Sequence, residues 1–204
     1  MPGVTDVVNK SLRLIGASPI TSLTDGSTSA NAADDVYTET RDELLRSHPW
    51  NFATKRVQLS QSATAPGFEF DYAFPLPSDW LRTISVHDND AGHGTILYRM
   101  EIVGSQRAIV TSSDAVYLRY VYQVTDPNLM AADFRAALEA ALARDLSIVL
   151  ASSNAIHDRM SIMAARLLNK ARSNDALGSF PELRPRGSWA ASRGGRRRND
   201  FLSD

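Results

Sequence analysis

The stretch RDELLRSHPWNFA, residues 41–53, marks the point where the chain changes its periodicity. Upstream of it, the apolar residues of Asn31–His48 recur at helical spacing and predict a helix, which Pro49 prevents from continuing. Trp50 and Phe52 follow at once, and we expect both rings to insert into the core beside the end of this helix. Downstream, apolar residues recur with a period of two, which is typical of strands. The stretch therefore separates a helical part of the chain from a β part.

Three further helices are predicted from the same spacing. They are expected over Thr5–Ile15, Asp133–Ser152 and Ala155–Ser173. Thr5, Asn31 and Asp133 are the residue types that cap helix N-termini, so each is the expected first residue of its helix. The helix over 133–152 is apolar around most of its circumference, and a helix of this kind is buried either in a core or between subunits.

The middle of the chain predicts short strands joined by turns. Aromatic residues alternate with others along Phe68–Phe74, and strands are also expected over Leu81–His87, Ile96–Val103, Ala108–Thr111 and Ala115–Gln123. The residues DNDAGHG, 88–94, have the composition of a hairpin loop. We expect an antiparallel meander or a small barrel of four to six strands.

The predicted fold is therefore α+β: mainly a helical bundle of about four helices, with an inserted small antiparallel β domain and an extended C-terminal tail. The bundle is expected from residues 1–56 and 126–173, and the β domain from residues 57–125. Residues 174–204 are expected to form an extended basic arm, because they are poor in aliphatic residues and rich in Gly, Ser, Arg and Pro.

Composition excludes several kinds of site. The chain has 204 residues and no Cys, which rules out disulfides, thiolate metal sites and a cysteine nucleophile. Its formal net charge of -1 is divided unevenly, with -3 on residues 1–173 and +2 on residues 174–204. The chain as a whole is thus neither a basic nucleic-acid binder nor an acidic protein. No segment has the length and apolarity of a membrane span, and we expect a soluble protein without a membrane partner.

A metal site is suggested only by His87, Asp88, Asp90 and His93, and it is not favoured. Their spacing fits no standard pattern, and a calcium loop starting at Asp88 would need Gly where His93 stands. A polar hairpin tip explains these residues better.

Paired carboxylates occur at Asp34–Asp35 and Asp42–Glu43, and neither pair predicts catalysis. We expect both pairs on the solvated face of a helix, with Asp34 and Asp35 in its first turn. The chain also has no Gly-rich phosphate loop and no nucleophile elbow. We therefore expect no catalytic residue, no cofactor and no metal, that is, a protein that is not an enzyme.

The C-terminal tail combines basic and apolar residues. Six arginines and three large apolar side chains stand out: Arg184, Arg186, Trp189, Arg193, Arg196, Arg197, Arg198, Phe201 and Leu202. Arginine and tryptophan are common hot-spot residues at protein interfaces, which favours an anchor for a protein partner. Arginines with interleaved aromatics can also bind nucleic acid, and a solvated tail without a role is a third interpretation.

Four segments of the chain, taken in order, resemble a known family. They are LRLIGASPITSLTD (12–25), RDELLRSHPWNFA (41–53), YAFPLPSDWLR (72–82) and YVYQVTDPNLMAADFRAALEAALARDLS (120–147). This succession resembles the tail tubular protein A family of tailed bacteriophages, the head-to-tail adaptor or connector proteins. The resemblance covers roughly residues 5–170 and is most distinctive at HPWNFA and LPSDWLR.

The resemblance implies a structural virion protein at the head–tail interface, assembled in the host cytoplasm. Family members typically form a homo-oligomeric ring of twelve copies under the portal protein. The ring extends the channel through which genomic DNA passes and offers a platform to the next tail component, a nozzle or tail-terminator protein. C-terminal extensions of related adaptors often clasp the portal, so the nine tail residues above are the expected portal-binding residues. The alternative is a DNA-binding accessory protein that uses the Arg-rich tail.

Overall fold

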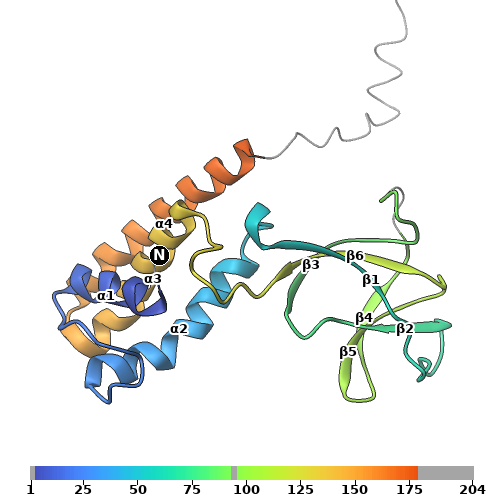
Figure 1. Ribbon diagram of the computed structural model, residues 1–204, viewed down its shortest axis with the longest axis horizontal. Helices are drawn as coiled ribbons and strands as arrows, with labels where there is room; N and C mark the ends of the chain where they lie inside the picture. Colours follow the sequence, from blue (N-terminus) through green and yellow to red (C-terminus); the bar gives the residue numbers. More distant parts are fainter. Residues whose placement is uncertain (1–2, 93–95, 179–204) are drawn as a thin grey trace, which may run out of the picture.

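The computed structural model describes residues 3–92 and 96–178, and within them the fold is α+β, as predicted (Figure 1). The helices are α1 (Val4–Ile15), α2 (Thr28–Arg46), α3 (Ala132–Ala151) and α4 (Asn154–Leu177), with a 3-10 turn at Asn51–Ala53. The strands are β1 (Thr54–Leu59), β2 (Tyr72–Pro75), β3 (Trp80–His87), β4 (Arg99–Val103), β5 (Gln106–Thr111) and β6 (Val116–Tyr122). The helices occupy one half of the molecule and the strands the other.

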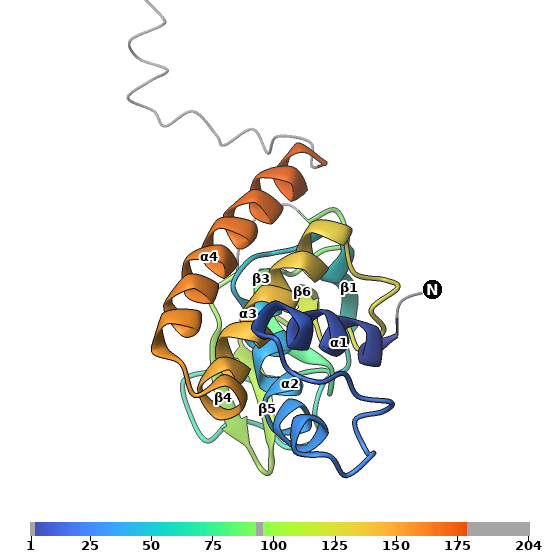
Figure 2. The same cartoon turned by 90° about the vertical axis from the view of Figure 1, so that its left-hand side faces the viewer.

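The helical half is built around α3, which packs against α1, α2 and α4 (Figure 2). Its buried residues lie on every side of the helix: Phe134, Ala137, Leu138, Ala140, Ala141, Leu142, Ala143, Leu146 and Ser147. A helix that is apolar nearly all round must have neighbours on several sides, and here three helices of the same chain supply them. The expected burial of this helix in a core is confirmed.

The starts of α1 and α2 differ from those predicted. Gly3, rather than Thr5, precedes α1, and its backbone N–H donates to the Asp6 carboxylate at 2.8 Å. Ser27, rather than Asn31, caps α2, because its hydroxyl accepts from the Ala30 N–H at 3.2 Å. The helix therefore begins one turn earlier than predicted. A better cap, not the first apolar residue, decides where a helix starts.

The two C-terminal helices also have corrected ends. Asp133 lies in the first turn of α3 and does not cap it, since Ala131 occupies that position. The last helix runs to Leu177, so residues 174–177 belong to α4 and not to the arm. Its buried residues include Met160 and Ala171, which agrees with the helical spacing that predicted this helix.

The β half consists of two three-stranded antiparallel sheets. One has the order β1–β6–β3 and the other β2–β5–β4. The expected meander is therefore wrong in its strand order. The last strand, β6, is the central strand of the first sheet because its residues are buried on both faces, whereas β1 is largely exposed. An apolar cluster joins the two sheets: Leu59, Phe74, Val86, Ile109, Val116, Leu118 and Tyr120.

Two strand predictions were wrong at the start of the β half. The strand β1 was not predicted, and residues 54–56 belong to this sheet rather than to the bundle. Lys55, Arg56 and Gln58 interrupt the alternation of apolar and polar residues by which strands are predicted. An edge strand tolerates this because such side chains can remain exposed to solvent. The aromatic alternation from Phe68 does not form a strand until Tyr72, since Glu69 has a φ of 72° and Phe68 is 85% exposed. The first residues of β3, β4, β5 and β6 lie one to three residues from those expected. The last residues of β3, β4 and β5 are the expected His87, Val103 and Thr111, and β6 ends one residue early.

Contacts at the base of the β half join it to α2. The Gln123 side-chain amide donates to Asp42 at 2.6 Å, and the Arg82 guanidinium donates to the Arg46 carbonyl at 3.1 Å. Val121 and Val124 are fully buried and belong to the helical core cluster. The end of β6 and the segment after it thus share the core of the bundle, which fixes where the sheets leave it.

Candidate functional site

The residues considered for metal binding do not gather into a site. His93 lies outside the described residues. His87 ends β3 and is half-buried, while Asp88 and Asp90 are exposed in the loop that follows. Residues 3–92 and 96–178 contain no group of three or more His, Asp or Glu that could hold a metal ion.

The two carboxylate pairs have different surroundings. Asp34 and Asp35 are exposed, although they lie beyond the first turn of α2 because the helix begins earlier. Asp42 is partly buried, which corrects the expectation of a solvated face: it accepts from Arg41 at 2.8 Å and from Gln123 at 2.6 Å. Burial raises the pKa of the neighbouring Tyr37 hydroxyl. Asp42 thus joins α2 to the β half.

A concave surface lies over the first sheet. A cavity of about 430 Å³ is lined there by Arg56, Gln58, Ser85, His87, Tyr117 and Arg119, among others. Arg56 and Arg119 are direct partners in the register between β1 and β6. Like charges directly opposite each other disfavour a sheet. The lining also includes Asp90, so this cavity carries charges of both signs.

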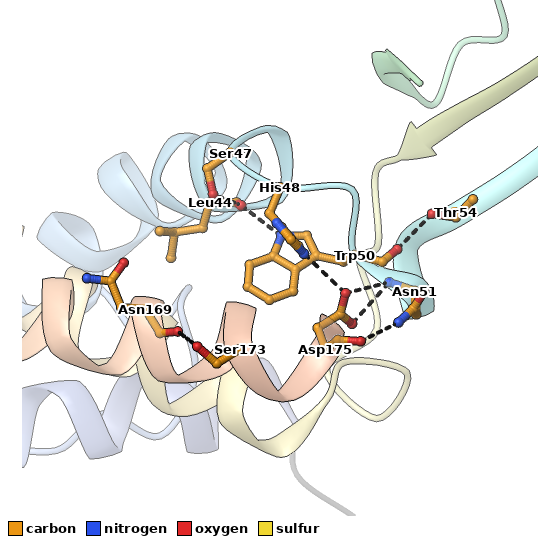
Figure 3. Close-up of polar contacts among 9 residues, drawn as sticks. All are labelled: Leu44, Ser47, His48, Trp50, Asn51, Thr54, Asn169, Ser173 and Asp175. Atoms are coloured by element: carbon orange, nitrogen blue, oxygen red, sulfur yellow. Dashed lines mark hydrogen bonds and ion pairs between the residues drawn. The ribbon is translucent and has the colours of Figure 1, made fainter. Parts of the chain in front are cut away.

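A second cluster holds the end of α4, three residues before the last described residue (Figure 3). The Asp175 carboxylate lies 3.2 Å from Nε2 of His48 and accepts the Asn51 backbone N–H at 3.1 Å. The Asn51 side-chain amide donates in turn to the Asp175 carbonyl at 2.7 Å. We call the group of His48, Asn51 and Asp175 the α4 clasp. It ties the last turn of α4 to the segment that follows α2.

The clasp rests on a buried aromatic cluster. Trp50 is 1% exposed, and its indole N–H donates to the Leu44 carbonyl at 3.0 Å. Its ring centroid lies 4.7 Å from that of His48 and 5.0 Å from that of Phe134, both in edge-on geometry. Phe52 is partly buried against the same core. The expected insertion of the two aromatic residues after Pro49 is therefore confirmed.

The α4 clasp fixes the point from which residues 179–204 leave the described part of the chain. The sequence analysis missed it, because His48 and Asp175 are 127 positions apart. One signal was available: an acidic residue in the last turn of a helix opposes the helix dipole and needs a compensating donor. Asp175 has two such donors.

Replacing Asp175 with alanine is expected to lower the free energy of unfolding by about 1–3 kcal/mol. The donors that now bond to its partly buried carboxylate would lose their acceptor. Asp158→Ala is the matched control, since Asp158 also lies beside a histidine, at 3.4 Å, but has a 79% exposed side chain. This control should change stability by less than about 0.5 kcal/mol. If the two substitutions changed the free energy of unfolding in urea equally, the α4 clasp would not contribute to stability more than an exposed ion pair does.

Exposed apolar side chains mark another part of the helical half. Ile148 and Val149 on α3 are 48% and 65% exposed, and Ile162 on α4 is 72% exposed. Most other apolar side chains of α3 are buried or partly buried, so its large exposed apolar side chains lie near its C-terminal end. Ile148 and Val149 are consecutive residues, and exposed apolar groups that occur together are typical of a contact surface.

The nine predicted portal-binding residues of the tail all lie outside the described residues. Comparison of the chain with models of known protein families and with curated proteins finds no match. Among the described residues, no helix is long and apolar enough to cross a membrane.

Proposed function

We propose that the protein is a structural head-to-tail adaptor of a tailed bacteriophage. In this proposal copies of the chain form a ring that joins the portal to the tail and extends the DNA channel. The chain is not an enzyme and needs no cofactor. The resemblance over residues 5–170 supports this function, and the observation that carries it furthest is the exposed apolar end of α3 with Ile162 of α4.

A subunit of a closed ring must bury surface against two neighbours, and apolar side chains favour such contacts. Ile148, Val149 and Ile162 now face water, and full burial of an aliphatic side chain stabilises an association by about 1.5–3 kcal/mol. The remaining surface of α3 packs against α1, α2 and α4 of its own chain. Its C-terminal end is therefore available to a neighbouring copy. Different turns of α3 would then pack in the core of the subunit and in the contact between neighbouring subunits.

The charge of the chain suits a channel for DNA. Residues 1–173 carry a net charge of -3, so a lumen built from them would not hold the phosphate backbone strongly. The arm carries the opposite charge and starts at the α4 clasp. In the proposal it reaches the portal through Arg184, Arg186, Trp189 and the residues beyond.

Negative-stain imaging of the purified protein, with and without its portal, tests the proposal. Ring-shaped particles on the portal are expected. Isolated monomers that never join the portal would contradict the adaptor function.

The same images should separate the ring contact from the arm. Val149→Asp with Ile162→Asp is expected to abolish rings, because two charges would enter an apolar contact. Thr38→Asp adds one such charge at an exposed position of α2 and should leave rings intact; Val149→Asp alone is the variant with the same added charge. A chain ending at Gly178 should keep its fold but no longer bind the portal protein. Normal docking of that chain would show that the arm is not the anchor.

The DNA-binding alternative predicts a different outcome. Affinity for duplex DNA would fall steeply with salt, and more so for the intact chain than for one with Arg196, Arg197 and Arg198 changed to alanine. The adaptor function predicts weak DNA binding that these substitutions barely change.

A further inference from the structure

The two sheets of the β half have four edge strands, and these differ in how they are protected. The edges are β1 and β3 in one sheet and β2 and β4 in the other. An edge strand offers unpaired backbone groups to any other strand, so proteins usually block it with Pro, with charges or with a bulge.

Three of the four edges carry such a device. The edge β2 ends in Pro75, which has no N–H to donate. The edge β3 has two shifts of register against β6, which bend it away from regular pairing. The edge β1 carries Lys55 and Arg56 side by side, and both are exposed.

The strand β4 has no Pro, no Lys and no register shift against β5. Four of its five residues are exposed. Met100 and Ile102 point to one face, where they are 43% and 74% exposed, and Leu97 just before the strand is 79% exposed. Arg99 and Glu101 alternate with them on the other face. Its two charged residues are of opposite sign, whereas Lys55 and Arg56 of β1 are both positive and would repel a second copy of that strand. Among the four edges, β4 is therefore the one suited to pair with itself.

We propose that β4 pairs antiparallel with β4 of a second copy of this chain, centred on Met100. In this register Met100 lies opposite Met100, and Arg99 of each copy lies opposite Glu101 of the other. Ile102 lies opposite Tyr98. The two three-stranded sheets would join into one sheet of six strands.

The charges and the symmetry select this register. A two-fold axis perpendicular to a sheet keeps equivalent side chains on the same face of the sheet. The axis must therefore lie midway between the two copies of one β4 residue. Centring on Glu101 would place Glu101 opposite itself, and like charges opposite each other are unfavourable. Centring on Met100 forms two Arg–Glu pairs and an apolar pair. Arg99 is free to turn, because its contact with Glu69 is long, at 3.5 Å, and exposed.

The two-fold contact is complete with two copies of the chain. Each copy covers the open edge of the other, so no edge remains for a third chain, and open-ended strand addition is prevented. This two-fold contact uses the β half, whereas the proposed ring contact uses the helical half. A two-fold axis would make the two faces of a ring alike, so this pairing belongs to copies outside the ring, and its test does not depend on the adaptor function.

Site-specific disulfide cross-linking tests the register, because the natural chain has no Cys. Directly opposite residues have Cα atoms about 4.5–5.5 Å apart, which is within disulfide reach. Met100→Cys should therefore give a covalent dimer under mild oxidation. Glu101→Cys is the matched control on the same strand: its two copies would be roughly 7–8 Å apart and should stay largely uncoupled. Efficient coupling of Glu101→Cys but not of Met100→Cys, or of neither, would overturn the proposal.

Charge exchange gives a second test that needs no cysteine. Sedimentation should detect a concentration-dependent dimer of the natural chain, at twice its 22.4 kDa mass, or larger particles in which dimers are joined. Glu101→Arg should weaken the β4 contact at least tenfold, since it places Arg opposite Arg99. Adding Arg99→Glu to this variant should restore the contact. Restoration supports the pairing, and a double variant as weak as the single one contradicts it, provided that both show unchanged circular dichroism.

Discussion

Trp50→Ala should lower the free energy of unfolding by about 3–5 kcal/mol, the range for truncation of a buried aromatic residue. Trp50 is 1% exposed and packs against both His48 and Phe134. Its loss would leave a cavity under the α4 clasp, at the place where α2, α3 and α4 meet. Chemical denaturation of the purified protein measures this change.

Trp50→Phe separates the ring from its hydrogen bond. This variant keeps an aromatic side chain but cannot donate to the Leu44 carbonyl, so a smaller loss of about 1–2 kcal/mol is expected. A denaturation midpoint that neither substitution moves would show that Trp50 does not carry the packing of this junction.

Phe74→Ala is the second substitution with a large expected effect, again about 3–5 kcal/mol. Phe74 lies on β2, is 1% exposed and belongs to the apolar cluster that joins the two sheets. Each sheet has only three strands, and such small sheets depend on packing against each other. Truncation should therefore destabilise the β half above all, which hydrogen exchange of the β-strand amides can localise.

Phe68→Ala provides the matched control in the same sequence pattern. Phe68 and Phe74 belong to one run of alternating aromatic residues, but Phe68 is 85% exposed. Its truncation should change the free energy of unfolding by less than about 0.5 kcal/mol. Similar effects of the two substitutions would mean that the run is a continuous strand, as its alternation predicts, and that β2 does not begin at Tyr72.

The alternating run shows why a periodic pattern can mislead. Alternation reports which side chains could share a face, but it holds no information on backbone torsion. Glu69 adopts a left-handed conformation with a φ of 72°, which ends regular pairing before Tyr72. The opposite error occurs at β1, where Lys55, Arg56 and Gln58 mask a real strand, because only its partner β6 holds it in place.

The candidate site was predictable only in part. The insertion of Trp50 into the core followed from its place after Pro49, since a chain that leaves a helix at a proline brings the next aromatic residues against the helix end. The α4 clasp and the pairing of Asp42 with Gln123 did not follow, because each joins residues that are more than 80 positions apart and polar residues carry no periodic signal.

The sequence by itself determined the α+β class, the succession of two helices, a β region and two helices, and the burial of α3. These follow from local spacing and from an apolar circumference that only burial can satisfy. Tertiary structure alone decided the strand order, because antiparallel partners are selected by side-chain packing between distant segments. It also made β4 an edge strand, because its short sequence does not show that β5 is its one partner among the described strands.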